Sequence, residues 1–202
     1  MTDLPMHQAA PVRRHLTRDT AATDVALVAT FAALIAACAT LTIAVGAVPI
    51  TLQTFAVLLT GAVLGPRRAL LALGLYLAIG LAGVPVFSGG RTGLMVLAGP
   101  SVGYVVSFPV AAAVVGLLVG RIPARIGGAA RTVGIFAACV AATVAVVYPL
   151  GIAGMAWRLD LTVGEAFVAN ATFIPGDLLK CAAAAVTAAA VLRAFPGLQR
   201  RS

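Results

Sequence analysis

An acid and a lysine stand three residues apart in an apolar stretch near the carboxyl end, residues 174–180 (IPGDLLK). A charged side chain inside hydrocarbon costs roughly 2.5 to 3.5 kcal/mol, so such residues usually face a cavity or a partner. Pro175 and Gly176 suit the start of a helix, which places Asp177 in its first turn and Lys180 on the same face. The pair predicts a polar site within the membrane. The alternative is an acid that caps the helix beside a lysine extending toward the interface.

Another cation stands in a glycine-rich loop, residues 85–93 (PVFSGGRTG). Paired glycines are typical of a turn, but a turn does not require Arg91. Together, Arg91, Lys180 and Asp177 carry a net charge of +1. That charge suits a ligand with one carboxylate and a neutral polar head. The residues alone leave open whether Arg91 contacts a ligand or only shapes its loop.

The composition is that of an integral membrane protein, because 61% of the 202 residues are hydrophobic, 10% are charged and the mean hydropathy is +1.07. The net charge of +8 does not indicate nucleic acid as a partner, since the basic residues separate apolar runs and form no basic, aromatic face. Membrane lipid is the expected surrounding. Cys38, Cys139 and Cys181 lie in apolar stretches without metal-ligand spacing, so we expect buried free thiols and no metal site.

Apolar runs of membrane-spanning length predict an all-α protein. We expect one membrane domain, residues 25–195, between a polar cytoplasmic tail, residues 1–24, and a short basic cytoplasmic tail, residues 196–202. The second of the predicted spans is the weakest, since it is short and opens with a proline and Gln53, which are tolerated where protein or a water-filled cavity surrounds them. The six predicted transmembrane helices cover residues 25–45, 50–65, 69–86, 94–120, 132–156 and 171–195.

The basic residues predict the orientation. All but three of the 14 lysines and arginines fall in segments that share one side if the six spans alternate. By the positive-inside rule both termini are cytoplasmic. The three exceptions are Arg91, Arg158 and Lys180, and the other eleven are Arg13, Arg14, Arg18, Arg67, Arg68, Arg121, Arg125, Arg131, Arg193, Arg200 and Arg201.

Several motifs, taken in series, resemble the BioY family, the biotin-binding S components of energy-coupling factor (ECF) vitamin transporters. The resemblance runs over nearly the whole membrane region. Each motif is unspecific alone, but the series with its spacing is specific. The motifs are residues 29–37 (ATFAALIAA), 48–54 (VPITLQT), 64–68 (LGPRR), 83–91 (GVPVFSGGR), 99–104 (GPSVGY) and 174–180 (IPGDLLK).

The resemblance implies a six-helix S-component fold that binds biotin near the outer face, in the plasma membrane of a prokaryotic cell. Asp177 would accept the ring N–H groups of biotin, Arg91 would hold its carboxylate and Lys180 could donate to either end. Further candidates for lining the site are Gln53, Tyr76 and Tyr104. For Tyr104, packing against a neighbouring helix is the alternative.

The resemblance also implies partners. Ala29 and Ala33 would belong to the face of the first helix that docks on the transmembrane coupling subunit, the T component, and two cytoplasmic ATPase subunits would drive uptake. Small residues four apart let membrane helices approach closely, although an alanine-rich chain contains many such pairs by chance. The chain lacks the Gly-Lys-Ser/Thr of a phosphate-binding loop, since Lys180 lies between leucine and cysteine.

Other function classes fit less well. An ion-coupled secondary transporter for a small carboxylate-bearing solute could use Asp177 beside Lys180 as a proton relay, but we find no convincing internal repeat. An enzyme is not expected, and no cofactor is implied. The two histidines, His7 and His15, lie in the tail, so a serine hydrolase would have no base within the bilayer.

Overall fold

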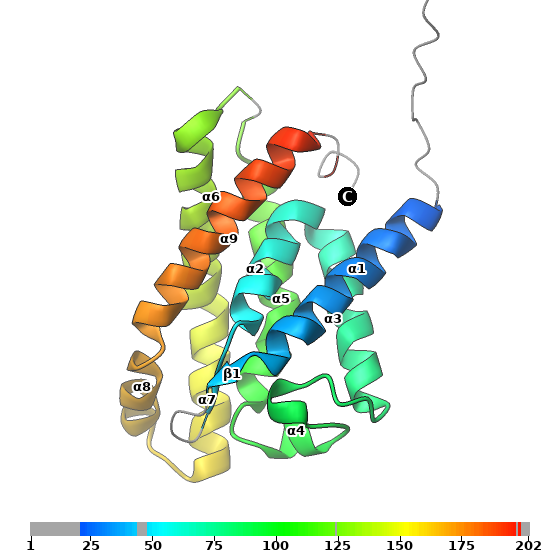
Figure 1. Ribbon diagram of the computed structural model, residues 1–202. Helices are drawn as coiled ribbons and strands as arrows, with labels where there is room; N and C mark the ends of the chain where they lie inside the picture. Colours follow the sequence, from blue (N-terminus) through cyan, green and yellow to red (C-terminus); the bar gives the residue numbers. More distant parts are fainter. Residues whose placement is uncertain (1–20, 44–47, 124, 197, 199–202) are drawn as a thin grey trace, which may run out of the picture.

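The protein folds into a bundle of apolar helices, as Figure 1 shows. The computed structural model describes residues 21–43, 48–123, 125–196 and 198. Within hydrocarbon, backbone N–H and C=O groups must be bonded internally, which favours helices. This confirms the predicted all-α class. The longer helices are α1 (Ala21–Thr40), α2 (Gln53–Leu64), α3 (Pro66–Leu81), α5 (Val102–Gly120), α6 (Gly128–Ala142), α7 (Tyr148–Leu159) and α9 (Ile174–Ala194).

Helices α6 and α7 form one continuous helix, Gly128–Leu159. With α1, α2, α3, α5 and α9 it gives six described rods, which correspond to the six predicted spans. Four of the described rods are long and apolar enough to cross a membrane. The second and third, α2 with 12 residues and α3 with 16, are shorter, so the count of six is approximate. Helix α1 begins at Ala21, ahead of the predicted tail boundary, and the rest of that tail lies outside the described residues.

Small elements gather at one end of the bundle, the lower end in Figure 1. Strands β1 (Thr42–Ile43) and β2 (Ile50–Thr51) pair antiparallel, where the sequence predicted the end of one span and the start of the next. That prediction was wrong at these four residues. Short helix α4 (Met95–Ala98) is separated from α5 at residues 99–101, inside the predicted fourth span, residues 94–120. Helix α8 (Val163–Ala171) precedes α9.

The opposite end carries most of the cations. The start of α1, the α2–α3 junction, the end of α5, the start of α6 and the end of α9 all lie there (Figure 1). Asp24 on α1 forms an ion pair of 2.6 Å with Arg68 on α3, whose Nη1 donates to the carbonyl of Leu198 at 2.9 Å. The positive-inside rule predicts that this end is cytoplasmic. The predicted cations Arg13, Arg14, Arg18, Arg200 and Arg201 lie outside the described residues.

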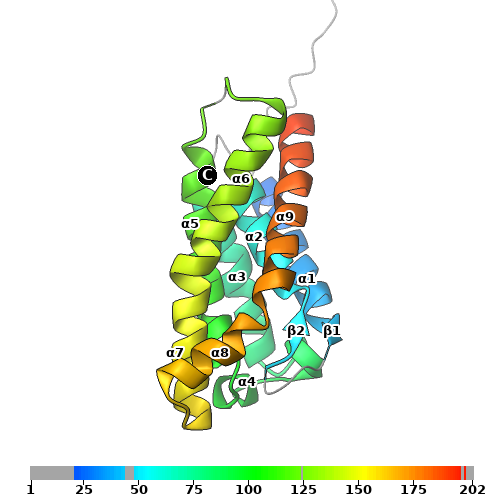
Figure 2. The ribbon, with the colours of Figure 1, turned by 90° about the vertical axis from the view of Figure 1, so that its left-hand side faces the viewer.

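A wide π turn, Thr143–Val147, joins α6 to α7. Pro149 follows it, and a proline inside a helix lacks the N–H and clashes with the carbonyl four residues earlier. A π turn is one way to accommodate that clash. Figure 2 shows α6, the turn and α7 as one long rod beside α5. The rod packs closely because Gly103 on α5 faces the backbone of α7, where a Cβ would overlap the carbonyl of Leu150.

Candidate functional site

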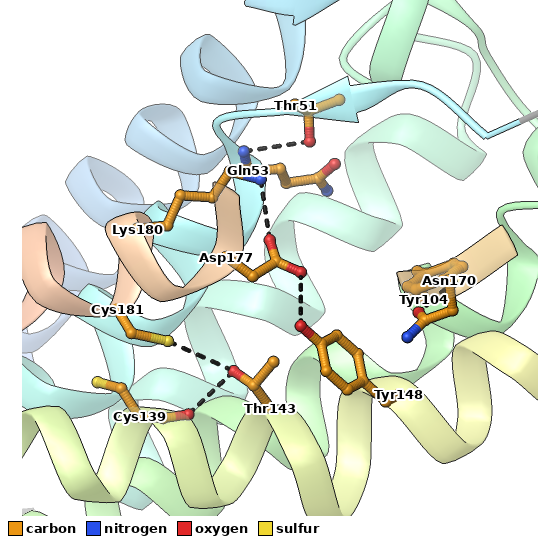
Figure 3. Close-up of polar contacts among 10 residues, drawn as sticks. All are labelled: Thr51, Gln53, Tyr104, Cys139, Thr143, Tyr148, Asn170, Asp177, Lys180 and Cys181. Carbon is orange, nitrogen blue, oxygen red and sulfur yellow. Dashed lines mark hydrogen bonds and ion pairs between the residues drawn. The ribbon is translucent and has the colours of Figure 1, made fainter. Parts of the chain in front are cut away.

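The acid and the lysine form an ion pair in the interior of the bundle. Helix α9 begins at Ile174 with proline at its amino end and Asp177 in its first turn, as the sequence predicted. Asp177 is 6% exposed, and its Oδ1 lies 3.0 Å from Nζ of Lys180. The hydroxyl of Tyr148 donates to Oδ2 at 3.3 Å. Figure 3 shows the carboxylate held between these two donors.

Tyr148 is the first residue after the π turn. The turn contains one more residue than an α turn, so it changes the face on which the following side chains lie. Pro149 and the π turn together place the Tyr148 hydroxyl on the carboxylate of a different helix. Lys180 on α9 and Tyr148 on α7 therefore both contact the carboxylate of Asp177. These two contacts restrict its side-chain rotamer.

Asp177 and Lys180 line a small cavity of about 50 Å³ near the outer end of the bundle. Gln53 and Tyr104 line it as well, so four of the six predicted ligand residues meet there. Most other lining residues are apolar. They include Val96, Val105, Phe108, Val147 and Phe173, with Val48, Pro49 and Ile50 from the segment around β2.

The cavity's other predicted polar residues are held by hydrogen bonds. The side-chain amide of Gln53 donates to the hydroxyl of Tyr76 at 2.9 Å, and that hydroxyl donates to the carbonyl of Val86 at 3.3 Å. Tyr76 is 1% exposed and lies behind Gln53, outside the cavity lining. The hydroxyl of Tyr104 donates to Oδ1 of Asn170 at 2.7 Å, and its ring packs edge to face on Phe173. Tyr104 thus both lines the cavity and packs.

Arg91 does not line the cavity but contacts two residues of its wall. Its Nε donates to the carbonyl of Ser88 at 3.0 Å, and its Nη2 donates to Oγ of Ser101 at 3.2 Å. Both serines line the cavity. The hydroxyl of Ser88 is buried and has no protein partner among the described residues. A buried hydroxyl without a hydrogen bond is costly, which makes Ser88 a natural contact for a polar group in the cavity.

Sequence reasoning missed Tyr148, Asn170, Ser88 and Ser101. Asn170 is an amide in an otherwise apolar stretch, and it is 1% exposed. That signal was available, because buried amides are normally hydrogen-bonded. Ser88 lay inside the loop singled out for Arg91. Tyr148 gave no local signal, since its contact depends on two distant helices.

The predicted docking residues Ala29 and Ala33 are exposed on α1. They line an apolar groove of about 320 Å³ between α1 and α3, together with Ala32, Ala36 and residues of α3. The groove contains no charged residue. Small residues along one face allow another helix to approach closely.

No group of histidine, cysteine, aspartate and glutamate within the described residues could hold a metal ion. Cys38, Cys139 and Cys181 are buried and free, as predicted. The hydroxyl of Thr143 donates to the carbonyl of Cys139 at 2.9 Å and lies 3.7 Å from the sulfur of Cys181. The thiols of Cys139 on α6 and Cys181 on α9 pack where these two helices meet.

Comparison with known proteins places this arrangement in a family. The sequence profile of the BioY family matches residues 7–197. The biotin transporter BioY of Rhizobium etli is 38% identical over 183 residues, which cover 89% of this chain and 98% of the relative. The biotin transporter BioY of Rhodobacter capsulatus is 36% identical over 188 residues, covering 86% and 95%. A crystal structure of the S-component for biotin from an ECF-type ABC transporter superposes with a TM-score of 0.78 at 25% identity, covering 85% of this chain and 92% of that one.

Proposed function

Because this chain belongs to the BioY family, we propose that it binds biotin as the S component of an ECF transporter. The observation that carries the proposal is the buried Asp177–Lys180 pair on the wall of an otherwise apolar cavity. Ligand sites typically combine apolar walls with a few placed polar groups. Biotin needs that combination, since its fused rings and valerate chain are largely apolar and its ureido group is polar.

Asp177 and Lys180 are complementary to the ureido ring. A carboxylate oxygen of Asp177 accepts a ring N–H, and the ammonium of Lys180 donates to the ureido carbonyl. Tyr148 keeps the carboxylate of Asp177 oriented through Oδ2. Gln53, whose side-chain amide donates to Tyr76, also lines the cavity. Hydrogen bonds to charged groups contribute about 1.5 to 3 kcal/mol each.

The carboxylate of biotin then lies toward the Ser88 and Ser101 wall. Ser101 accepts a hydrogen bond from Arg91, so its own hydroxyl hydrogen remains available to a carboxylate. Ser88 presents an unpartnered hydroxyl. Arg91 supplies the positive charge behind both serines, and its planar fork suits a carboxylate. Arg91 thus provides the positive charge at the end of the site that would hold the carboxylate of biotin.

The groove at Ala29 and Ala33 is the proposed docking face for the T component. Two cytoplasmic ATPase subunits would drive uptake by the assembly. A partner helix can lie close along these small side chains. The chain has no phosphate-binding loop of its own. We place the assembly in the plasma membrane of a prokaryotic cell.

Calorimetric titration of the purified protein with biotin tests the binding proposal. We expect one-to-one binding of biotin, and no comparable heat from vitamins that lack a ureido ring. Absence of biotin binding would refute the proposal. Uptake in cells distinguishes the ion-coupled alternative, because an S component requires the ATPase subunits whereas a proton-coupled carrier fails on addition of an uncoupler.

Ala33→Trp tests the docking face. We expect biotin affinity to stay within about twofold, since the groove reaches the cavity only through Tyr76, which lies behind Gln53. Co-purification with the T component and ATPases should fall at least about tenfold. Val133→Trp is the matched control, because Val133 is 64% exposed on α6. Assembly of Ala33→Trp at the level of the control would remove α1 from the docking face.

A further inference from the structure

A hollow of about 550 Å³ opens at the cytoplasmic end of the bundle. It lies where α5 ends, α6 begins and α9 ends, so its walls come from three helices and the loop between α5 and α6. Three arginines line it, namely Arg121, Arg131 and Arg193. The remaining lining is mostly apolar, with Ile122 and Leu192 among it. The biotin cavity lies toward the opposite end and shares none of these residues.

Within the described residues, the three guanidinium groups have no acidic counterpart. None of the residues that line the hollow is acidic. The ion pairs in the described part of the chain are Asp24 with Arg68 and Asp177 with Lys180, so none of the three arginines is paired with a carboxylate there. Arg193 donates from Nε to the carbonyl of Ala189 at 3.3 Å. Like charges around one hollow repel one another unless an anion compensates them.

The position of the hollow indicates which anion it binds. The helix ends at this face are the level at which lipid headgroups meet the protein, and this is the cytoplasmic face by the distribution of arginines. Basic pockets between helices on that side bind anionic headgroups. Arginine pairs with phosphate in a bidentate manner. The apolar walls of the hollow suit the glycerol and acyl portion of a lipid. Phe195, which is 63% exposed, extends this apolar surface next to Pro196 of the hollow.

We propose that the hollow binds the phosphate of an anionic phospholipid from the cytoplasmic leaflet. The proposal does not depend on biotin binding. The bound lipid would join the end of α5 to the ends of α6 and α9, which are otherwise held by apolar packing at this face.

The test uses two double variants that each remove two charges from the cytoplasmic end. Arg131→Gln with Arg193→Gln removes charges from the hollow. Arg67→Gln with Arg125→Gln removes charges outside its lining and serves as the control, since both of these side chains are exposed. Binding of dihexanoyl phosphatidylglycerol to each purified protein in a neutral detergent is measured by calorimetry. Dihexanoyl phosphatidylcholine and glycerol phosphate are titrated in parallel, and circular dichroism verifies the helical fold.

We expect the phosphatidylglycerol affinity to fall at least about tenfold in the hollow variant and less than about twofold in the control. Phosphatidylcholine should bind more weakly to the parent protein. Equal losses in both variants would attribute binding to general surface charge and overturn the proposal. Glycerol phosphate binding as tightly as the lipid would assign the hollow to a soluble phosphate instead. If the hollow variant does not fold, Arg193→Gln against Arg125→Gln gives the same comparison with one charge each.

Discussion

Replacing the buried pair stepwise separates its structural role from its role in binding. The side chains of Lys180 and Asp177 are 10% and 9% exposed, and they lie 3.0 Å apart. Asp177→Leu leaves the ammonium of Lys180 buried without its partner, and breaking such a pair costs roughly 3 to 5 kcal/mol of stability. Adding Lys180→Met replaces the pair by apolar groups, which is often nearly neutral. We therefore expect the double variant to recover most of the lost stability.

Biotin binding should not recover with it. Both variants lack the acceptor for the ring N–H groups, a loss of about 1.5 to 3 kcal/mol or roughly 10- to 150-fold in Kd. Stability is measured by thermal unfolding in detergent and affinity by calorimetry. Asp160→Asn is the control, since Asp160 is exposed at the end of α7, asparagine tolerates its left-handed backbone, and the change should cost at most about 0.5 kcal/mol without changing Kd. A double variant that binds biotin like the parent would refute the assignment of the ureido ring to Asp177.

Three further outcomes are expected. Gly103→Ala should lower the unfolding temperature, because its Cβ would overlap the carbonyl of Leu150 on α7, whereas Gly74→Ala, with open space around it, should leave it unchanged or raise it slightly. Arg91→Ala should weaken binding of biotin more than of biotin amide in calorimetry, and equal losses would make Arg91 a loop residue only. Glu165 is the sole glutamate, and hydrogen bonds from the Thr162 side chain and backbone lower its pKa. Its ¹³C carboxyl signal should titrate at higher pH in Thr162→Ala than in the parent, and an unchanged midpoint would contradict the hydroxyl's role. Because a lowered pKa stabilises the folded state above the unfolded value, that contribution disappears as pH falls through the folded pKa.

The features that could be predicted from the sequence are those that depend on local chemistry. Pro175 and Gly176 mark the start of a helix wherever they stand, and Asp177 accordingly lies in the first turn of α9. The interruption at residues 99–101 follows from the glycine and proline there. The membrane class depends on composition, which no tertiary contact alters.

The features that could not be predicted depend on contacts between distant segments. The hairpin at Thr42 and Thr51 forms only when the two strands meet, and each strand of two residues is too short for a period-2 pattern. Tyr148 reaches Asp177 because a π turn changes the face on which it lies. Arg91 donates to the carbonyl of Ser88, a backbone contact that the residue pattern does not indicate, and the residues alone left open whether it contacts a ligand. The net charge of +1 on Arg91, Lys180 and Asp177 could be counted in advance, but the position of Arg91 behind the serines could not.

The π turn between α6 and α7 has a consequence for the whole rod. One additional residue shifts the angular phase of every later side chain by about 100°. Helix α6 packs against α5 and α9, whereas α7 packs against α5 and α8. A deletion of one residue within 143–147 would therefore misdirect both the Tyr148 hydroxyl and the surface that meets Gly103, even if every remaining side chain were kept. For relatives aligned to this chain, a one-residue gap at that point marks a change in the ligand site rather than a harmless difference in helix length.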